Sequence, residues 1–543
     1  MLFRSISENL HVLVIIDEDA PIGDRELRLS VKNKLSNPII FQVGQLPEVR
    51  KPAPQPALTA IQSRKSYDDP SIRKPMEPLT VTLPVVLNGQ ILPGDVDRYR
   101  FAAQKGQRIA VAVNAQSLIP YISDAVPGWF QAVATLYDSA GRELAVSDDD
   151  QFRPDPLLLY EIPSDGEYQL EIRDSIYRGR EDFVYRASVG VLPVVTGIFP
   201  LGGRTGEPVS IELNGWNLQD KTFALTPTAP GLQSLPISFP GIRRAAFIVD
   251  DLPSQPDIEP NDTIAAAQGV SFPVAVNGRI GRTGDVDIFR LNGNKGQTVE
   301  IEVKARRLGS PLDSIVKLTT ASGEVIAYND DTDDRTAGLT VHQADSQLTA
   351  TLPADGQYYI VIGDAQSKGG SEYAYRLYIR EATPDFQLRA SPSSINLYAG
   401  ASAPVTMYAF RKNGFSQTIQ LSLKDAPKGF SVSPDYIPAG QDRIRITLNA
   451  PAGLQNGLFD LTIIGEAMIG GRKVVRQAAP VDDRMQAFGN RHLTPAQSLI
   501  ACVNRRPKAT FAARIETPEP IRVPIGGTAT VKVKIPVIRS RTR

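Results

Sequence analysis

Residues 284–304 read GDVDIFRLNGNKGQTVEIEVK. In the last part of this stretch the apolar residues at 299, 301 and 303 alternate with Glu300, Glu302 and Lys304. Successive side chains of a β-strand point to opposite faces, so the alternation predicts a strand with an apolar face toward a core and a charged face toward water.

The same pattern occurs a second time. Gly94-Asp95-Val96-Asp97 matches Gly284-Asp285-Val286-Asp287 at an offset of 190 residues. Further matches at this offset are Lys105-Gly106-Gln107 with Lys295-Gly296-Gln297, Asp165-Gly166 with Asp355-Gly356, Tyr168 with Tyr358 and Tyr185 with Tyr375. Self-similarity at a fixed spacing indicates one fold present twice. Short strands with closely spaced turns indicate antiparallel β-sandwiches.

Composition bounds the class of protein. The chain has 543 residues, which predicts roughly three to five domains. Lysine plus arginine and aspartate plus glutamate both total 59, so there is no global charge to attract nucleic acid. The single cysteine, Cys502, excludes an internal disulfide framework and a multi-cysteine metal cluster.

Both ends of the chain read as strands. The apolar run from Leu10 to Ile16 lacks the basic start and cleavage site of a secretory signal. No stretch approaches the ~18 apolar residues of a membrane helix, so we expect no membrane span. A hairpin cannot bury its apolar face alone. We therefore expect a fragment of a longer protein, with any export signal outside it.

The repeats carry a family resemblance. Asp257-Ile258-Glu259-Pro260-Asn261-Asp262-Thr263 and the strand at 284–289 resemble the acidic opening and the Gly-Asp-x-Asp strand of bacterial pre-peptidase C-terminal (PPC) domains. The stretch around 195–250 is similar to IPT/TIG immunoglobulin-like domains, and the segment at 35–49 resembles those that precede such repeats in multidomain planctomycete-type secreted proteins. The resemblance implies an exported protein located in the cell envelope or outside the cell.

We therefore expect an all-β chain of tandem antiparallel β-sandwich domains, namely PPC-like jelly-roll or sandwich repeats and immunoglobulin-like units. The expected boundaries are 1–50 for the end of a truncated immunoglobulin-like domain, 51–79 for a linker, 80–193 for the first repeat, 194–250 for the IPT/TIG-like unit, 251–383 for the second repeat, 384–515 for an immunoglobulin-like domain with an irregular 478–507 segment, and 516–543 for the start of a further truncated β domain.

The second repeat carries a candidate calcium site. Calcium takes six to eight oxygen ligands, which clustered carboxylates and amides supply. The candidate ligands are Asp257, Glu259, Asn261, Asp262, Asp285 and Asp287. The resemblance implies the same ion, because collagen-binding members of the family bind calcium through this segment and strand. The alternative is that Pro260-Asn261-Asp262 is only a turn.

The first repeat departs from this pattern. Met76-Glu77-Pro78-Leu79 stands where we expect the acidic opening, although Asp95 and Asp97 remain. We expect this copy to bind calcium weakly or not at all.

Other polar and aromatic groups favour ordinary structural roles. The acidic runs 148–150 and 330–334 are compatible with a second cation site but are more typical of solvated loops. The tyrosines between 358 and 378, together with Trp129 and Trp216, are interpreted as packing residues. A cysteine nucleophile would need Cys502 beside His492, in a region without a recognisable motif.

No catalytic motif of a hydrolase or phosphate-binding enzyme is present in the sequence. The expected function is a non-catalytic exported protein that spaces domains or presents binding surfaces to an extracellular protein or polysaccharide. The alternatives are accessory domains of a secreted peptidase whose catalytic domain lies outside this chain, a glycan- or protein-binding adhesin, and an enzyme with an unrecognised site.

Overall fold

A computed structural model describes residues 12–31, 34–52, 77–119, 128–235, 246–332, 344–485, 491–505, 514–517 and 528–534. Apart from two short 3₁₀ turns, η3 (Ile264–Ala266) and η4 (Arg306–Leu308), the regular structure of these residues is β-strand. The expected all-β class is confirmed. Within the same ranges there is no helix with the length and apolarity that crossing a bilayer requires.

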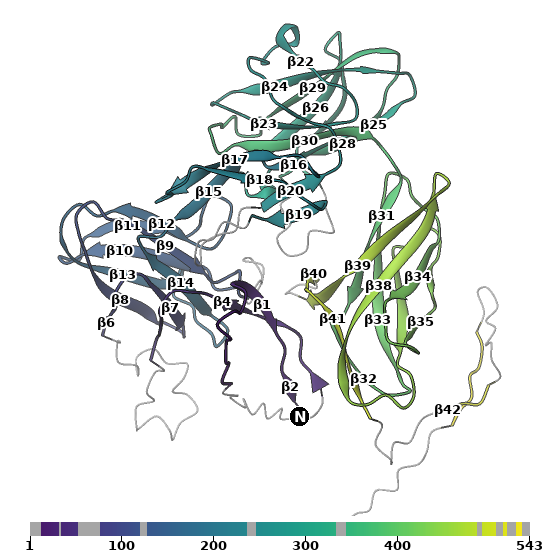
Figure 1. Ribbon diagram of the computed structural model, residues 1–543, viewed down its shortest axis with the longest axis horizontal. Helices are drawn as coiled ribbons and strands as arrows, with labels where there is room; N and C mark the ends of the chain where they lie inside the picture. Colours follow the sequence, from purple (N-terminus) through teal and green to yellow (C-terminus); the bar gives the residue numbers. More distant parts are fainter. Residues whose placement is uncertain are drawn as a thin grey trace, which may run out of the picture.

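The first sandwich consists of two five-stranded sheets (Figure 1). Its strands are β5 (Glu48–Arg50), β6 (Leu79–Thr80), β7 (Val85–Gln90), β8 (Val96–Ala103), β9 (Arg108–Asn114), β10 (Ala132–Asp138), β11 (Glu143–Ser147), β12 (Leu157–Glu161), β13 (Gly166–Asp174) and β14 (Val184–Gly190). The strand orders are β11-β10-β13-β8-β6 and β12-β9-β14-β7-β5. Because β5 belongs to the second of these sheets, the sandwich begins before the expected linker and not after it.

The second sandwich has the same architecture. Its strands are β21 (Ser254–Pro256), β22 (Gln268–Gly269), β23 (Val274–Arg279), β24 (Val286–Gly293), β25 (Thr298–Lys304), β26 (Ser314–Thr320), β27 (Val325–Asn329), β28 (Gln347–Thr351), β29 (Gly356–Asp364) and β30 (Ala374–Glu381). The strand orders are β27-β26-β29-β24-β22 and β28-β25-β30-β23-β21, which match the first sandwich strand for strand.

The alternating pattern builds the two cores. Val299, Ile301 and Val303 of β25 are fully buried between the sheets of the second sandwich. In each sandwich a buried tyrosine ring, Tyr185 or Tyr375, lies over a glycine of the neighbouring strand, where a Cβ atom would collide with the ring. Gly89 and Gly278 therefore shape the place where each tyrosine hydroxyl reaches the other sheet.

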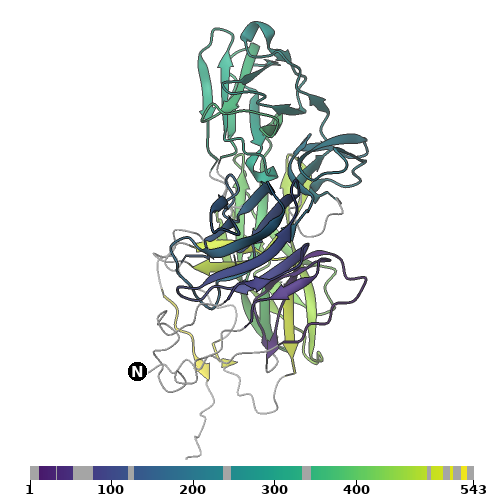
Figure 2. The ribbon, with the colours of Figure 1, turned by 90° about the vertical axis from the view of Figure 1, so that its left-hand side faces the viewer.

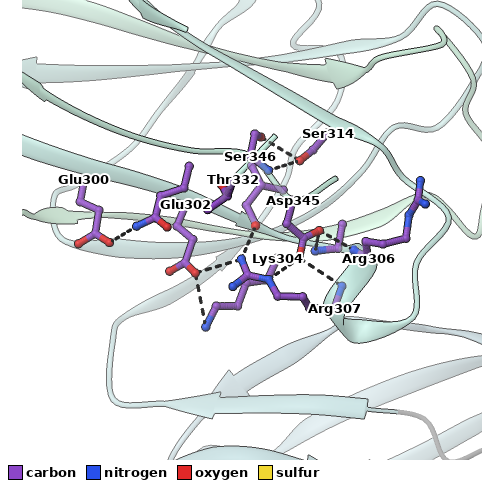
Figure 3. Close-up of polar contacts among 12 residues, drawn as sticks. Glu300, Glu302, Lys304, Arg306, Arg307, Ser314, Thr332, Asp345 and Ser346 are labelled. Atoms are coloured by element: carbon purple, nitrogen blue, oxygen red, sulfur yellow. Dashed lines mark hydrogen bonds and ion pairs between the residues drawn. The ribbon is translucent and has the colours of Figure 1, made fainter. Parts of the chain in front are cut away.

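The charged face of β25 does not lie in water, and that expectation is wrong. Glu300 and Glu302 are 4% and 6% exposed. Arg380 on β30 bonds both carboxylates, at 3.1 and 2.8 Å, and Arg307 reaches Glu302 at 3.1 Å. Figure 3 shows Lys304 and Arg307 gathered around Glu302, with Asp345 beside Arg307. Paired charges can be buried where lone ones cannot, so sheet alternation alone did not reveal this covered face.

A smaller unit lies between the sandwiches. Two three-stranded sheets, β15-β17-β18 and β16-β20-β19, form this middle unit. Its strands are β15 (Val194–Phe199), β16 (Gly202–Arg204), β17 (Val209–Trp216), β18 (Thr222–Leu225), β19 (Gly231–Ser234) and β20 (Ala246–Asp250). Asp250, at the end of β20, accepts hydrogen bonds from Arg376 and Tyr378 of the second sandwich at 2.9 Å each, which fixes this junction.

The fourth unit follows the second sandwich. Its strands are β31 (Asp385–Ser391), β32 (Ser394–Tyr398), β33 (Ser402–Lys412), β34 (Ile419–Lys424), β35 (Ser431–Ser433), β36 (Tyr436–Ile437), β37 (Arg443–Asn449), β38 (Gly457–Ile469), β39 (Arg472–Met485), β40 (Arg491–Pro495) and β41 (Leu499–Asn504). The expectation of an irregular 478–507 segment is wrong for most of that range. β39 continues through it because it pairs in turn with β38, β31 and β40.

The N-terminal segment lies between the first sandwich and the fourth unit (Figure 1). It contains β1 (Gly23–Leu27), β2 (Ser30–Val31), β3 (Lys34–Leu35) and β4 (Ile39–Val43), paired as β1-β4 and β2-β3. The side-chain amide of Asn396 in β32 bonds the backbone N–H and C=O of Leu35, at 2.7 and 2.9 Å. In Figure 2 the second sandwich stands above, and the first sandwich lies in front of the fourth unit.

Beyond residue 505 the described residues contain one strand pair, β42 (Arg514–Ile515) with β43 (Val533–Lys534). Most of the expected further domain at 516–543 lies outside the described residues.

Candidate metal centre

The acidic segment of the second sandwich is fixed against two strands. Strand β21 runs parallel to β23, and the N–H of Asp257, the residue after β21, donates to the carbonyl of Asn277 at 2.8 Å. The N–H of Ile288 in β24 donates to the carbonyl of Asn261 at 3.1 Å. These bonds hold residues 257–261 beside the start of β24.

This arrangement brings together four of the six predicted ligands. Asp257, Glu259 and Asp287 each place a carboxylate oxygen within 4.8 Å of the other two. Asn261 adjoins them, since its Nδ2 donates to Asp257 Oδ1 at 2.6 Å. Asp287 Oδ2 accepts the hydroxyl of Tyr375 at 2.5 Å.

Two buried oxygens in this cluster have no hydrogen-bond partner among the residues that the structure describes. Asn261 and Asp287 are both fully buried, and the Oδ1 atom of each is the one without a described partner. Leaving a buried acceptor unsatisfied costs about 1–3 kcal/mol, and more for a charged group. Both atoms lie in a cluster of carboxylates, which is a donor set that could hold a cation. The residues fit a bound metal ion.

The other two predicted ligands are engaged elsewhere. Asp262 makes a bidentate pair with Arg282, at 3.1 and 3.0 Å, and Asp285 is 3.1 Å from the same guanidinium. Asp285 also accepts the N–H of Gly281 at 2.6 Å. Arg282 therefore holds the rim of the cluster, and the structure does not bring Asp262 and Asp285 to its centre.

The electrostatics of the cluster disfavour negative charge. Burial, reinforced by the charge of Asp257, raises the pKa of Asp287 to about 9 despite the bond from Tyr375. Burial and the charge of Glu259 raise the pKa of Asp257 to about 6. A positive charge placed beside these two carboxyls would lower both pKa values, so a bound cation would relieve this environment.

The first sandwich contains the same aspartate and tyrosine with a different neighbour. The hydroxyl of Tyr185 donates to Asp97 Oδ2 at 2.7 Å, as Tyr375 does to Asp287. Asp97 Oδ1, however, lies 2.5 Å from Nζ of Lys51. Burial raises the pKa of Asp97, and the charge of Lys51 opposes that shift.

Sequence reasoning missed Lys51 because the comparison with the second repeat began at Met76-Glu77. By strand pairing, Leu79 of β6 and Gln268 of β22 occupy equivalent places, so Glu77 lies well after the position of Asp257. Met76 itself lies outside the described residues. The sequence does contain a signal for the equivalence of Lys51 and Asp257. Both sandwiches have a Leu-Pro dipeptide, Leu46-Pro47 or Leu252-Pro253, directly before β5 or β21.

The remaining candidates have structural surroundings. Asp148, Asp330 and Asp331 are exposed, while Asp333 and Asp334 lie outside the described residues. Tyr358, Tyr359, Tyr375 and Tyr378 are buried, which agrees with their interpretation as core residues, and Trp216 packs under the guanidinium of Arg108 at 3.6 Å. Cys502 is buried in β41.

Comparisons with known proteins give one significant sequence match. No family model matches the chain. A probable subtilase-type serine protease of Deinococcus radiodurans is 37% identical over 124 residues, which cover 20% of this chain and 16% of that protein. The chain therefore spans only a small part of the length of that curated relative.

The solved structures that are similar to parts of this chain have low sequence identity to it, as two of them illustrate. The pre-peptidase C-terminal domain of a Bacillus anthracis collagenase is 16% identical with a TM-score of 0.17, covering 22% of this chain and 98% of that domain. A putative secreted protein from Eubacterium rectale is 10% identical with a TM-score of 0.18, covering 36% and 75% of the two chains. At these scores the likeness carries no functional argument.

Proposed function

We propose that this chain is a non-catalytic, exported multidomain β-sandwich protein whose second PPC-like sandwich binds calcium. One observation carries the proposal. In the described part of the second sandwich the buried Asp287 Oδ1 has no hydrogen-bond partner, whereas the equivalent oxygen of Asp97 in the first sandwich is paired with the ammonium group of Lys51. The backbone frame and the aspartate–tyrosine pair are shared, and the first sandwich has a built-in positive charge beside the aspartate where the second has carboxylates.

The donor set fits calcium best among common divalent cations. Asp257, Glu259 and Asp287 supply carboxylate oxygens and Asn261 supplies an amide oxygen. Calcium accepts six to eight such oxygens in variable geometry and takes its remaining ligands from carbonyls or water. No cysteine or histidine among the described residues belongs to this cluster, which disfavours zinc.

A cation here would stiffen the chain between two units. The segment that carries Asp257 and Asn261 follows directly from the junction with the middle unit, where Asp250 bonds Arg376. Tying this segment to Asp287 on β24 would hold β21 in its sheet. Rigid sandwiches at fixed spacing could then present their surfaces to an extracellular protein or polysaccharide.

Thermal unfolding of the full chain in excess calcium and in excess chelator tests this function. An ion that binds only the folded state at 100 times its dissociation constant adds about 2.7 kcal/mol, so the transition of the second sandwich should rise by several degrees. In Asp287→Asn, which keeps an oxygen for the Tyr375 hydroxyl, the rise should vanish. Asp330→Asn, in the exposed acidic run, is the matched control and should keep it.

Two results would count against the calcium function. One is an unfolding profile that is identical in calcium and chelator. The other is a rise that survives in Asp287→Asn, because the ion would then bind elsewhere.

A second candidate is that these sandwiches are accessory domains of a secreted peptidase. The match to a subtilase-type protease, at 37% identity over 124 residues, favours it. Sequencing the gene on both sides of this chain tests the idea. A protease domain in the same reading frame supports an accessory role, and complete flanking sequence without one excludes it.

A further inference from the structure

The two sandwiches place residues of opposite charge at one structural position. Lys51 and Asp257 each follow a short strand that pairs in parallel with the next strand of the sheet. The N–H of Lys51 donates to the carbonyl of Asn88 at 2.9 Å, as that of Asp257 does to Asn277. Lys51 then faces Asp97, and Asp257 faces Asp287. Each of these is the second aspartate of its Gly-Asp-Val-Asp motif.

The ammonium of Lys51 is coordinated as a metal ion would be, by oxygen atoms from separate elements. Its Nζ lies 2.5 Å from Asp97 Oδ1, 3.2 Å from Asp95 Oδ2 and 2.9 Å from the carbonyl of Gln90. An ammonium group has three protons to donate, and three oxygens accept them here. Lys51 is only 8% exposed, so the pair is shielded from water and salt.

Asp97 and Asp287 differ in the partner of one carboxylate oxygen. In both sandwiches Oδ2 accepts a tyrosine hydroxyl. Oδ1 is bonded to Lys51 in the first sandwich and has no partner among the described residues of the second. The hydroxyl chain in the first sandwich also extends from Tyr185 to Tyr99, at 2.6 Å. The first site is thus complete from the residues of the chain alone.

We propose that Lys51 is a permanent counter-cation of the first sandwich, a covalent replacement for the metal ion of the second. The first sandwich is then stable without a metal ion, and calcium stabilises only the second sandwich. The comparison between sandwiches rests on the proposed calcium function, whereas the role of Lys51 itself does not.

Lys51→Met in the full chain tests that role in the presence of chelator. Removing one partner of a buried ion pair leaves an uncompensated charge, so the transition of the first sandwich should fall by about 10 °C. Arg50→Met is the matched control, because it removes the same charge from an exposed neighbour. It should shift the transition by no more than about 2 °C.

The double variant Lys51→Met/Asp97→Asn separates charge from packing. Removing both charges should recover at least half of the loss, because the single variant suffers mainly from the unpaired carboxylate. If Lys51→Met does not fold, folding of the double variant supports the same conclusion. A double variant no more stable than Lys51→Met would overturn the counter-cation role, as would a Lys51→Met effect equal to that of Arg50→Met.

Hydrogen exchange of the unmodified full chain gives an independent readout. Adding calcium should slow exchange in peptides that cover 257–262 and β24 and leave those that cover β7 and β8 unchanged. Slowing in β7 and β8 would overturn the proposal, because the first sandwich would then bind the ion itself. If neither sandwich responds, the calcium function fails, and the Lys51 variants still decide the role of the lysine.

Discussion

The outer faces of β9 and β25 occupy the same place in the two sandwiches and differ in chemistry. Ala110 and Ala112 of β9 are 0% and 7% exposed and pack with Leu192 and Val194 at the start of the middle unit. The equivalent positions of β25 are Glu300 and Glu302, which are equally buried but surrounded by arginine and lysine. Both sandwiches therefore bury this outer face of the strand. The side chains that cover the face determine whether it is apolar or charged.

The frame behind these faces is shared. Asp155 accepts the backbone N–H groups of Ala115, Gln116 and Ser117 after β9. Asp345 accepts the N–H groups of residues 305–307 after β25 in the same way. The second sandwich adds Arg307, which pairs with Asp345 at 2.6 Å and reaches Glu302. One backbone frame therefore supports an apolar interface in one copy and an ionic one in the other.

The largest loss of stability is expected when a charged residue replaces an apolar residue on the outer face of β9. Ala112→Glu places a carboxylate in the apolar cluster that Ala112 forms with Leu192 and Val194. Burying an unpaired charge should destabilise the first sandwich by about 3–5 kcal/mol, measured by denaturant unfolding of the full chain. Ala102→Glu, on the exposed side of β8, should cost less than about 0.5 kcal/mol. Equal effects at the two positions would mean that β9 has no covered outer face.

A smaller effect is expected from Glu302→Gln. Burial alone would raise the pKa of Glu302, yet the charges of Lys304, Arg307 and Arg380 lower it to about 2. The unfolded pKa is about 4.3. The native state therefore binds fewer protons, and the stabilisation is present above pH ~4 and lost as the pH falls toward 2.

At pH 7 the Glu302→Gln substitution should lower the free energy of unfolding by about 2–3 kcal/mol, and the difference should disappear near pH 2. Urea unfolding at several pH values measures it, with Glu324→Gln in an exposed turn as the control. A difference independent of pH would show that the loss comes from packing and not from the ion pairs.

The smallest effect should come from the link between this ionic face and the fourth unit. Asn413 Nδ2 donates to Glu300 Oε2 at 3.1 Å and to the carbonyl of Thr383 at 3.0 Å. Its φ of 48° is left-handed, so Asn413→Gly keeps the backbone and removes only these bonds, at a cost of about 1 kcal/mol. Asp425→Gly, at an exposed residue with φ of 50°, is the control. Hydrogen exchange in β25 should rise only in Asn413→Gly.

The sequence predicted the strands well and their surroundings poorly. The period-two pattern at Val299–Lys304 correctly located the inner face of β25, because that face depends only on the strand itself. The pattern could not show that Glu302 is buried. The residues that bury it are Arg380, which is distant in the sequence, and Arg307, which lies outside the strand.

The candidate site shows the same division. Asp257, Glu259 and Asn261 were predicted as ligands because they lie close together in the sequence, and Asp287 because it belongs to the Gly-Asp-Val-Asp strand. The structure brings these four side chains together. Lys51 was missed because it lies 46 residues before Asp97 and its relation to Asp257 depends on strand pairing. For Asp262 and Asp285 the competing partner was Arg282, whose side-chain direction the sequence does not indicate.

The contact between Leu35 and Asn396 has a consequence for the order of events during synthesis. The two residues are 361 apart in the chain. At about 5–20 residues per second, translation takes roughly 20–70 s to produce Asn396 after Leu35. In that interval each sandwich can fold from residues that have already been synthesised. The contact of β2 and β3 with β32 cannot form until Asn396 has been synthesised. This contact is therefore a late step, and it reports that the whole chain up to the fourth unit has been completed.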